Sequence, residues 1–276
     1  MKKIIVILII NLLLTQCSLF KDNNIGTIII RGSDTMLMLN LKLAETYMEK
    51  NPGISIYVFG GGSKTGINAL MNRTIDIAAS SRPFEAEEIK ELVEKFGTLG
   101  IEYRIAKDGL SIYVNPENSI KNFTIQQIKD IFLGNITNWK ELGGDDHPID
   151  VIIRPPTSGT YGYFKKFILE NQEFTSNSKT ISKTEDIVQY IQKNKYAISY
   201  GGVGYGHKNL HANINGIEPS EKNVINETYP ITRYLYYYTN ENPPSHVREF
   251  IKWILSEEGQ KIVEEAGYYP IWNIRY

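Results

Sequence analysis

Residues 27–50 read TIIIRGSDTMLMLNLKLAETYMEK, and this stretch indicates the class of the fold. The β-branched run Thr27–Ile30 favours a strand. Gly32-Ser33-Asp34-Thr35 then forms a turn, and apolar side chains recur at helical spacing from Met36 to Lys50, until Asn51-Pro52-Gly53 stops the helix. A strand that passes through a short turn into a helix is the repeating unit of α/β folds.

The same alternation continues along the rest of the chain. Further strands are predicted over residues 54–59, 75–79, 103–114, 150–154, 197–200 and 231–238. Further helices are predicted over residues 64–72, 85–96, 125–133, 159–170, 184–193 and 245–265, with strands and loops in the polar stretch 207–228. We therefore expect an α/β fold of parallel or mixed sheets with flanking helices.

Composition and charge exclude several classes of protein. The 276 residues are 42% apolar and 22% charged, so the chain can bury a sizeable core and is not disordered as a whole. The formal net charge of −1 gives no support to a nucleic-acid partner, because such proteins usually carry a basic excess. The single cysteine, Cys17, cannot form a disulfide within the chain.

The N-terminal residues are typical of an export signal. Two lysines precede an almost continuously apolar run over residues 4–14, which suits a secretory signal and is too short to span a membrane. The segment around Cys17 resembles a bacterial lipoprotein signal, although Gln16 departs from the small residue usual there. We expect residues 1–16 to be a signal peptide and residues 17–24 to be a lipidated Cys17 and its tether; the alternative is an ordinary secretory signal with an incidental cysteine.

Three loops share one chemistry. GSDT at residues 32–35, GGGSKTG at 60–66 and TSGT at 157–160 each follow a predicted strand and open a predicted helix. A helix N-terminus offers unpaired N–H groups, glycine allows close approach of a ligand, and Ser and Thr add hydroxyl donors. At the carboxyl ends of parallel strands three such loops can converge on one anion, whereas each loop alone is better explained as a helix cap.

Two arginines stand beside these loops. Arg82 follows the predicted strand 75–79, and Arg154 ends the strand 150–154 just before the third loop. A guanidinium at a strand end suits two-point binding of an oxyanion. Each arginine alone is as well explained by pairing with a nearby acid at the surface.

Catalytic motifs do not stand out in the sequence. There is no nucleophile elbow and no zinc-protease motif. His207 and His211 have the spacing of helical metal ligands, but Gly204, Gly206 and Asn209 argue against a helix there. We therefore predict that both histidines are solvated loop residues.

Several segments in a fixed order resemble one family. They are GSDTM at 32–36, GGGSKTGI at 60–67, DIAASSR at 76–82, IFLG at 131–134 with Asn138-Trp139, RPPTSGT at 154–160, and GQ at 259–260 with GY at 267–268. Together they resemble the phosphate-binding protein of bacterial phosphate ABC importers over about residues 25–272.

The resemblance implies a two-lobed periplasmic-binding-protein fold of type II, with two sheets and a two-strand hinge. One lobe would hold residues 25–110 and 231–276, and the other residues 111–230. Inorganic phosphate would bind between the lobes and pass to a membrane-spanning ABC permease. The resemblance implies a monomeric binding protein without catalysis, metal or cofactor, exported and lipid-anchored at the periplasmic face of the cytoplasmic membrane or at the cell surface.

The resemblance also assigns residues to phosphate. The residues so implied are Ser33, Thr35, Ser63, Ser81, Arg82, Arg154, Ser158, Gly159 and Thr160. Some relatives carry an Asp in place of Ser81, where it accepts the proton of bound phosphate, and an Asp in place of Pro156, where it orients the arginine. We consider two roles for Asp34: the missing proton acceptor, or a cap of the following helix.

Three other functions stay open. A phosphatase on the same scaffold would need a metal cluster or a nucleophile with its base, and the sequence offers neither. A binding protein for sulfate, molybdate or another tetrahedral oxyanion would use the same loops and arginines. A surface lipoprotein with a protein ligand would show a large apolar patch, which a sequence cannot reveal.

Overall fold

Eight strands form one continuous mixed sheet in the computed structural model, which describes residues 26–272. The predicted signal peptide, Cys17 and the tether lie outside the described residues. The strands run in the order β2-β1-β3-β10-β4-β8-β6-β7. Their bounds are β1 (Gly26–Gly32), β2 (Ile54–Phe59), β3 (Ile77–Ser80), β4 (Ile101–Val114), β6 (Asp150–Ile153), β7 (Lys179–Thr180), β8 (Ala197–Gly202) and β10 (Thr232–Thr239).

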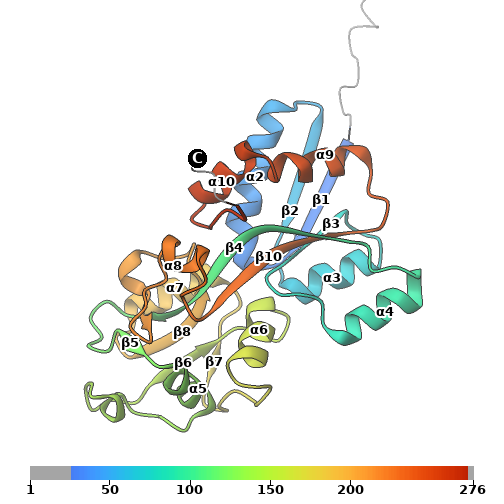
Figure 1. Cartoon of the computed structure of the whole chain (residues 1–276). Coiled ribbons are helices and arrows are strands. Elements are labelled where there is room, and N and C mark those ends of the chain that lie inside the picture. Colours follow the sequence, from blue (N-terminus) through green and yellow to red (C-terminus); the bar gives the residue numbers. More distant parts are fainter. Residues whose placement is uncertain (1–25, 273–276) are drawn as a thin grey trace, which may run out of the picture.

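Helices flank both halves of this sheet (Figure 1). The α-helices are α2 (Leu37–Lys50), α3 (Ser63–Met71), α4 (Ala86–Phe96), α5 (Ile125–Leu133), α6 (Gly159–Phe167), α7 (Thr184–Lys193), α8 (Glu221–Ile225), α9 (Ser245–Ile254) and α10 (Glu257–Glu265). Short 3₁₀ turns are η1 (Asp34–Met36), η2 (Trp139–Leu142) and η3 (Lys208–Leu210). The strands β5 (Asn122–Phe123) and β9 (Asn213–Ile214) pair separately, in parallel. In residues 26–272, no helix is both long and apolar enough to cross a membrane.

The long strand β4 joins the two halves of the sheet. Residues 101–109 of β4 pair with β10 in antiparallel fashion, and residues 110–114 pair with β8. Figure 1 shows β4 and β10 running side by side from one half of the molecule to the other. The two sheets expected from the sequence therefore share β4, and the hydrogen-bonded order passes through it.

Parallel pairing places the loops of interest on common edges. β1 pairs in parallel with β2 and with β3, so the carboxyl ends of these three strands lie together. In the other half β6 pairs in parallel with β7 and β8, and α6 follows β6 after a short loop. This is the usual position of ligand sites in α/β sheets, at the carboxyl ends of the strands.

Each half has a buried apolar core. Leu39 and Leu43 of α2 pack with Ile28 of β1 and with Phe250 of α9, all four fully buried. The other half buries a ring cluster in which Phe132, Phe164 and Tyr200 meet, with centroids 4.1–5.4 Å apart. Cores of this kind fix the strands that present the loops.

Most predicted elements are confirmed, with differences at their ends, but the stretch 207–228 that was predicted as strands and loops also contains the helix α8 and the 3₁₀ turn η3. The helix predicted over 159–170 ends at Phe167, because Glu170 and Asn171 adopt positive φ values of 51° and 65°. The last helical region divides into α9 and α10, where the Ser256 hydroxyl accepts the N–H of Gly259 and caps a new helix. The two-residue strands β5, β7 and β9 are too short to give a periodic signal.

Candidate functional site

Hydroxyl groups of the first half gather where β1, α3 and β3 meet. Ser33 follows β1, Ser63 opens α3 and Ser81 follows β3. The Ser33 hydroxyl donates to Ser81 Oγ at 3.0 Å, and the Ser81 N–H donates to Ser63 Oγ at 3.1 Å. All three side chains are buried. The structure thus brings the first two glycine-hydroxyl loops to one point, together with the end of β3.

The third loop reaches this point from the other half. Thr160 Oγ1 lies 2.8 Å from Thr35 Oγ1 and 3.5 Å from Ser81 Oγ. A Cβ atom on Gly159 would lie 2.1 Å from Ser63 Oγ, so only glycine allows this approach. We call Ser33, Thr35, Ser63, Ser81 and Thr160 the hydroxyl cradle.

Backbone groups bring the two halves together beside the cradle. The N–H of Lys64 donates to the carbonyl oxygen of Thr157 at 3.2 Å. Gly62 has a φ of 94°, and a Cβ atom there would lie 2.3 Å from that carbonyl oxygen. Any side chain at position 62 would therefore push the halves apart.

Ser158 has a local role in the structure. Its side chain accepts the N–H of Tyr161 at 3.4 Å and caps α6. Thr160, two residues further on, is fully buried and belongs to the cradle. The N-terminus of α6 therefore faces the cradle with its partial positive charge.

Arg154 is buried next to the cradle and is paired with Asp34. Its side chain is only 1% exposed; Nη2 donates to Asp34 Oδ2 at 2.9 Å, and Nη1 donates to Thr184 Oγ1 at 2.7 Å. The Nε atom is buried and has no hydrogen-bond partner in the protein. Burial lowers the pKa of Arg154, with Asp34 acting in the opposite direction. A buried N–H without an acceptor is costly, so this atom favours an oxyanion beside it.

Asp34 connects the first two loops with Arg154. Its Oδ1 accepts the N–H of Gly61 at 2.9 Å, while Oδ2 accepts Arg154. The 3₁₀ turn η1 begins at Asp34 and has no side-chain cap, so the helix-cap role considered for Asp34 is wrong. Asp34 lies where it can orient the arginine that Pro156 cannot orient.

Arg82 does not point into the cradle. Its Nη1 and Nη2 donate to the two carboxylate oxygens of Glu88 at 2.8 and 2.7 Å, and Nε lies 3.2 Å from Glu85. Burial alone would lower the pKa of Arg82, but the Glu88 carboxylate more than offsets this and raises it. The guanidinium of Arg82 is therefore directed at α4, and the prediction that it binds phosphate is not supported by its contacts.

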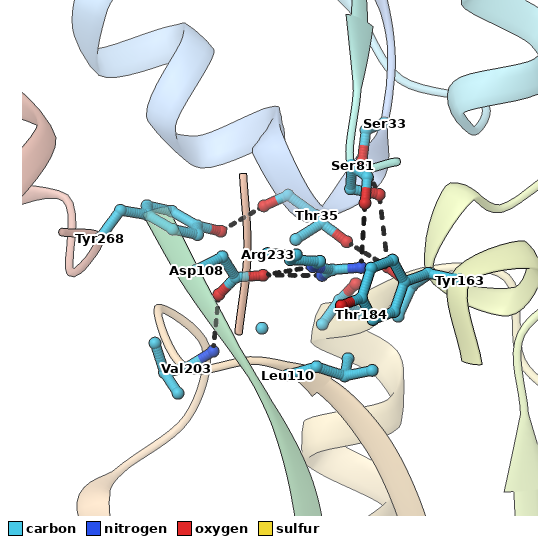
Figure 2. Close-up of polar contacts among 12 residues, drawn as sticks. Ser33, Thr35, Ser81, Asp108, Leu110, Tyr163, Thr184, Val203, Arg233 and Tyr268 are labelled. Atoms are coloured by element: carbon cyan, nitrogen blue, oxygen red, sulfur yellow. Dashed lines mark hydrogen bonds and ion pairs between the residues drawn. The ribbon is translucent and has the colours of Figure 1, made fainter. Parts of the chain in front are cut away.

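One buried ion pair at the cradle is missing from the sequence-based set. Arg233 of β10 donates through Nε and Nη2 to Asp108 Oδ2 of β4, at 2.9 and 2.7 Å. Figure 2 shows Arg233 between Asp108 and the cradle residues Ser81 and Thr35. The side chains are 1% and 0% exposed, and burial raises the pKa of Asp108. The available signal was Arg233 as the single charged residue of β10, and Asp108 as the last of four charged residues in β4 before an uncharged half.

His211 corrects another expectation. Its Nδ1 lies 3.0 Å from Ser111 Oγ and its ring packs edge-on against Tyr113. Burial lowers its pKa to about 4. His211 is therefore not a solvated loop residue, whereas His207 is exposed as predicted. Among residues 26–272, no three His, Cys, Asp or Glu side chains are placed to hold a metal ion.

Comparison with known proteins identifies the family. A family model described as a PBP superfamily domain matches residues 21–258. The phosphate-binding protein PstS of Bacillus subtilis is 34% identical over 253 residues, which cover 91% of this chain and 82% of that protein. The chain belongs to the PstS family. The PstS protein of Pseudomonas aeruginosa is 32% identical and covers 87% of this chain and 81% of its own length.

A solved structure supports the same assignment. It is a putative phosphate ABC transporter substrate-binding protein from Clostridium perfringens with bound phosphate, 34% identical, with a TM-score of 0.83. The match covers 90% of this chain and 100% of that chain. The PstS family and the expected type II fold are therefore confirmed, since the likeness extends over nearly all of the described residues.

Proposed function

We propose that this PstS-family protein binds inorganic phosphate in the hydroxyl cradle, outside the cytoplasm, and delivers it to an ABC importer. Residues 25–110 with 231–276 form one lobe in this proposal, and residues 111–230 form the other. The lobes close on the ligand through β4 and β10. A ligand that contacts both lobes stabilises the closed arrangement, because only that arrangement gives it all of its hydrogen bonds.

The observation that carries the proposal is the unpaired Nε of buried Arg154, whose ion-pair partner Asp34 directly precedes Thr35 of the cradle. A phosphate oxygen accepts from this N–H without displacing Asp34 or Thr184. The cradle hydroxyls and the N-terminus of α6 supply further donors. Phosphate carries enough acceptor oxygens to use all of these donors, whereas a neutral ligand of the same size carries too few.

Asp34 acts in this proposal as the residue that orients Arg154. Both of its oxygens already accept an N–H, one from Gly61 and one from Arg154. The P–OH group of hydrogen phosphate then donates a hydrogen bond to a hydroxyl oxygen of the cradle, where Ser81 replaces the acidic residue of some relatives. Selection of phosphate against sulfate depends on that hydroxyl acceptor.

A second candidate ligand follows from the same feature. Asp34 and Asp108 are each held by an arginine, so the cradle presents hydroxyls and no unpaired carboxylate. Such a site also fits sulfate, which has no proton to donate. Phosphate is preferred here because the PstS relatives and the Clostridium perfringens structure name it.

The remaining parts of the proposal concern location and assembly. Residues 1–16 direct export, Cys17 carries the lipid anchor, and the protein works as a monomer with a membrane-spanning permease. It needs no cofactor or metal and performs no catalysis. Mass spectrometry of the protein from membranes tests the anchor: a diacylglyceryl mass on Cys17 supports it, and an unmodified or absent Cys17 contradicts it.

Calorimetric titration tests the ligand. The full chain, stripped of bound anion, is titrated with phosphate and with sulfate without added metal. We expect one-to-one binding of phosphate, a loss of about tenfold or more in Ser81→Ala, and no change in the control Ser178→Ala, whose hydroxyl donates to Thr175 far from the cradle. Binding of neither anion contradicts the proposal, and stronger binding of sulfate replaces its ligand.

A further inference from the structure

In the part of the chain that the structure describes, Arg233 is the one side chain of β4 and β10 that donates hydrogen bonds to the cradle. It stands opposite Asp108 in the register between β10 and β4. Nε and Nη2 are both used by Asp108, and Nη1 donates to Thr160 Oγ1 at 3.2 Å and to the Ser81 carbonyl oxygen at 3.3 Å. One guanidinium therefore touches both halves of the cradle and the strands between them.

The bond to Thr160 restricts the direction of a hydroxyl. Arginine only donates, so Thr160 Oγ1 is the acceptor in this contact. The single hydrogen of Thr160 cannot point to Arg233, and two cradle oxygens lie within hydrogen-bond distance of Thr160 Oγ1: Thr35 Oγ1 at 2.8 Å and Ser81 Oγ at 3.5 Å. The contact with Arg233 thus leaves the Thr160 hydrogen to be donated within the cradle, to these oxygens or to an anion bound there.

The bond to Ser81 removes an unfavourable group from the same space. A backbone carbonyl oxygen repels an anion, and the Ser81 carbonyl lies at the cradle. The Nη1 of Arg233 covers it with a hydrogen-bond donor. The arginine thus makes the cradle more favourable to an oxyanion at two of its residues.

The guanidinium is itself held firmly. Its carbon lies 5.5 Å from the ring centroid of Tyr163, whose hydroxyl donates to the Thr232 carbonyl oxygen at 2.8 Å. Asp108 is fixed in turn by the N–H of Val203 at 3.2 Å. A planar fork with fixed neighbours can serve the carboxylate, the hydroxyl and the carbonyl together, whereas a lysine ammonium cannot.

We propose that Arg233, held by Asp108, is a positioning residue that makes Thr160 a committed donor to the anion and joins the crossing strands to both halves of the cradle. This inference rests on the proposed function, because it assigns a role in anion binding. Its action passes through Thr160 and Ser81 and requires no contact between Arg233 and the ligand.

A double-mutant cycle tests the proposal in the full chain, with phosphate and sulfate as titrants. Removal of Arg233 alone leaves Asp108 buried and unpaired, so the cycle starts from the neutral pair Asp108→Asn with Arg233→Gln. Its second arm is Thr160→Val, which removes the hydroxyl and keeps the shape. Arg104→Gln on β4 is the matched control, since that arginine is 56% exposed and outside the cradle.

We expect the neutral pair to weaken phosphate binding about tenfold and Thr160→Val to weaken it by a similar or larger factor. Combined, the changes should cost little more than Thr160→Val alone, because the arginine acts largely through that hydroxyl. Arg233→Lys keeps the charge beside Asp108 and should also bind weakly.

If the combined variant lost affinity by the product of the two separate factors, the arginine would act independently of Thr160 and the proposal would be overturned. Wild-type affinity in Arg233→Lys or in the neutral pair would overturn it too. A wild-type chain that binds neither anion would refute the proposed function instead, and this outcome is distinct from the others. Urea unfolding of each variant identifies any that is not folded. For such a variant, Arg233→Lys with and without Thr160→Val replaces the neutral pair in the cycle.

Discussion

Replacement of Asp34 by Asn separates two explanations of anion selectivity. In the structure both carboxylate oxygens of Asp34 accept N–H donors, from Gly61 and from Arg154, each at 2.9 Å. An asparagine at this position keeps one oxygen acceptor, but its NH₂ group must then face one of these two donors. Asp34→Asn should therefore loosen Arg154 without changing the volume of the site.

The size of the effect follows from the burial of the pair. The Arg154 side chain is 1% exposed and that of Asp34 is 14% exposed. Hydrogen bonds to charged groups contribute about 1.5–3 kcal/mol, and loss of one partner of a fully buried pair costs about 3–5 kcal/mol. Because Asp34 is partly exposed, we expect unfolding free energy to fall by about 2–3 kcal/mol and affinity for each dianion to fall about tenfold.

Calorimetry with phosphate and sulfate, at a pH where phosphate is mostly the dianion, provides the assay. Loss of orientation affects both anions alike, so the ratio of the two dissociation constants should stay within about twofold of wild type. The control is Asp76→Asn, because Asp76 accepts the N–H of Ile29 at 2.8 Å in the same half and away from the cradle. A selective loss of phosphate binding would refute our reasoning and make Asp34 the proton acceptor.

Three further predictions concern closure, a buried ion pair and pH. Gly62→Ala should lower phosphate affinity at least tenfold, because its Cβ would lie 2.3 Å from the Thr157 carbonyl oxygen of the other half. The control Gly97→Ala, with a φ of 71° and open space around it, should lower stability by only about 1 kcal/mol, and equal phosphate affinities of the two variants would contradict the prediction. Arg82→Met should reduce the unfolding free energy by about 3 kcal/mol, because Glu88 is left buried without its partner. The double variant Arg82→Met with Glu88→Leu should regain most of this stability and bind phosphate with unchanged affinity. A large loss of phosphate affinity in the double variant would place Arg82 in the site. Burial lowers the pKa of His211 to about 4, so between pH 6.5 and pH 4 this side chain binds a proton in the unfolded chain but not in the folded one. The unfolding free energy should therefore fall by roughly 2–3 kcal/mol on acidification through this window, and it should fall less in His211→Gln. Urea unfolding at several pH values tests this, and parallel pH profiles of the two proteins would contradict it.

Local signals in the sequence were sufficient for the elements that form the cradle. The β-branched run before Gly32 and the helical spacing after Thr35 predicted β1 and α2, and the same pattern recurs at β2–α3 and β6–α6. Parallel strands place such turns at one edge, so the meeting of the first loops follows from local pattern plus one topological rule. The approach of α6 from the other half came from the family resemblance.

Partners distant in the sequence could not be predicted in the same way. Arg82 and Arg154 have similar positions after a strand, yet one meets Glu88 six residues away and the other meets Asp34 120 residues away. Nothing in the local sequence distinguishes these outcomes. Arg233 and Asp108, 125 residues apart, depend on the register of β10 against β4, which is a property of the assembled sheet.

The charge pattern around the cradle explains why register matters for function. Arg154 is matched by Asp34 and Arg233 by Asp108, so the buried side chains nearest the cradle carry no net charge in total. An entering dianion is therefore held by directed N–H and O–H groups and helix ends rather than by excess positive charge. Directed donors depend on their orientation, and the two acids fix the orientation of the arginines. The same acids limit the attraction of the site for any anion that cannot accept several hydrogen bonds at once, so we locate selectivity in the geometry of the hydroxyls.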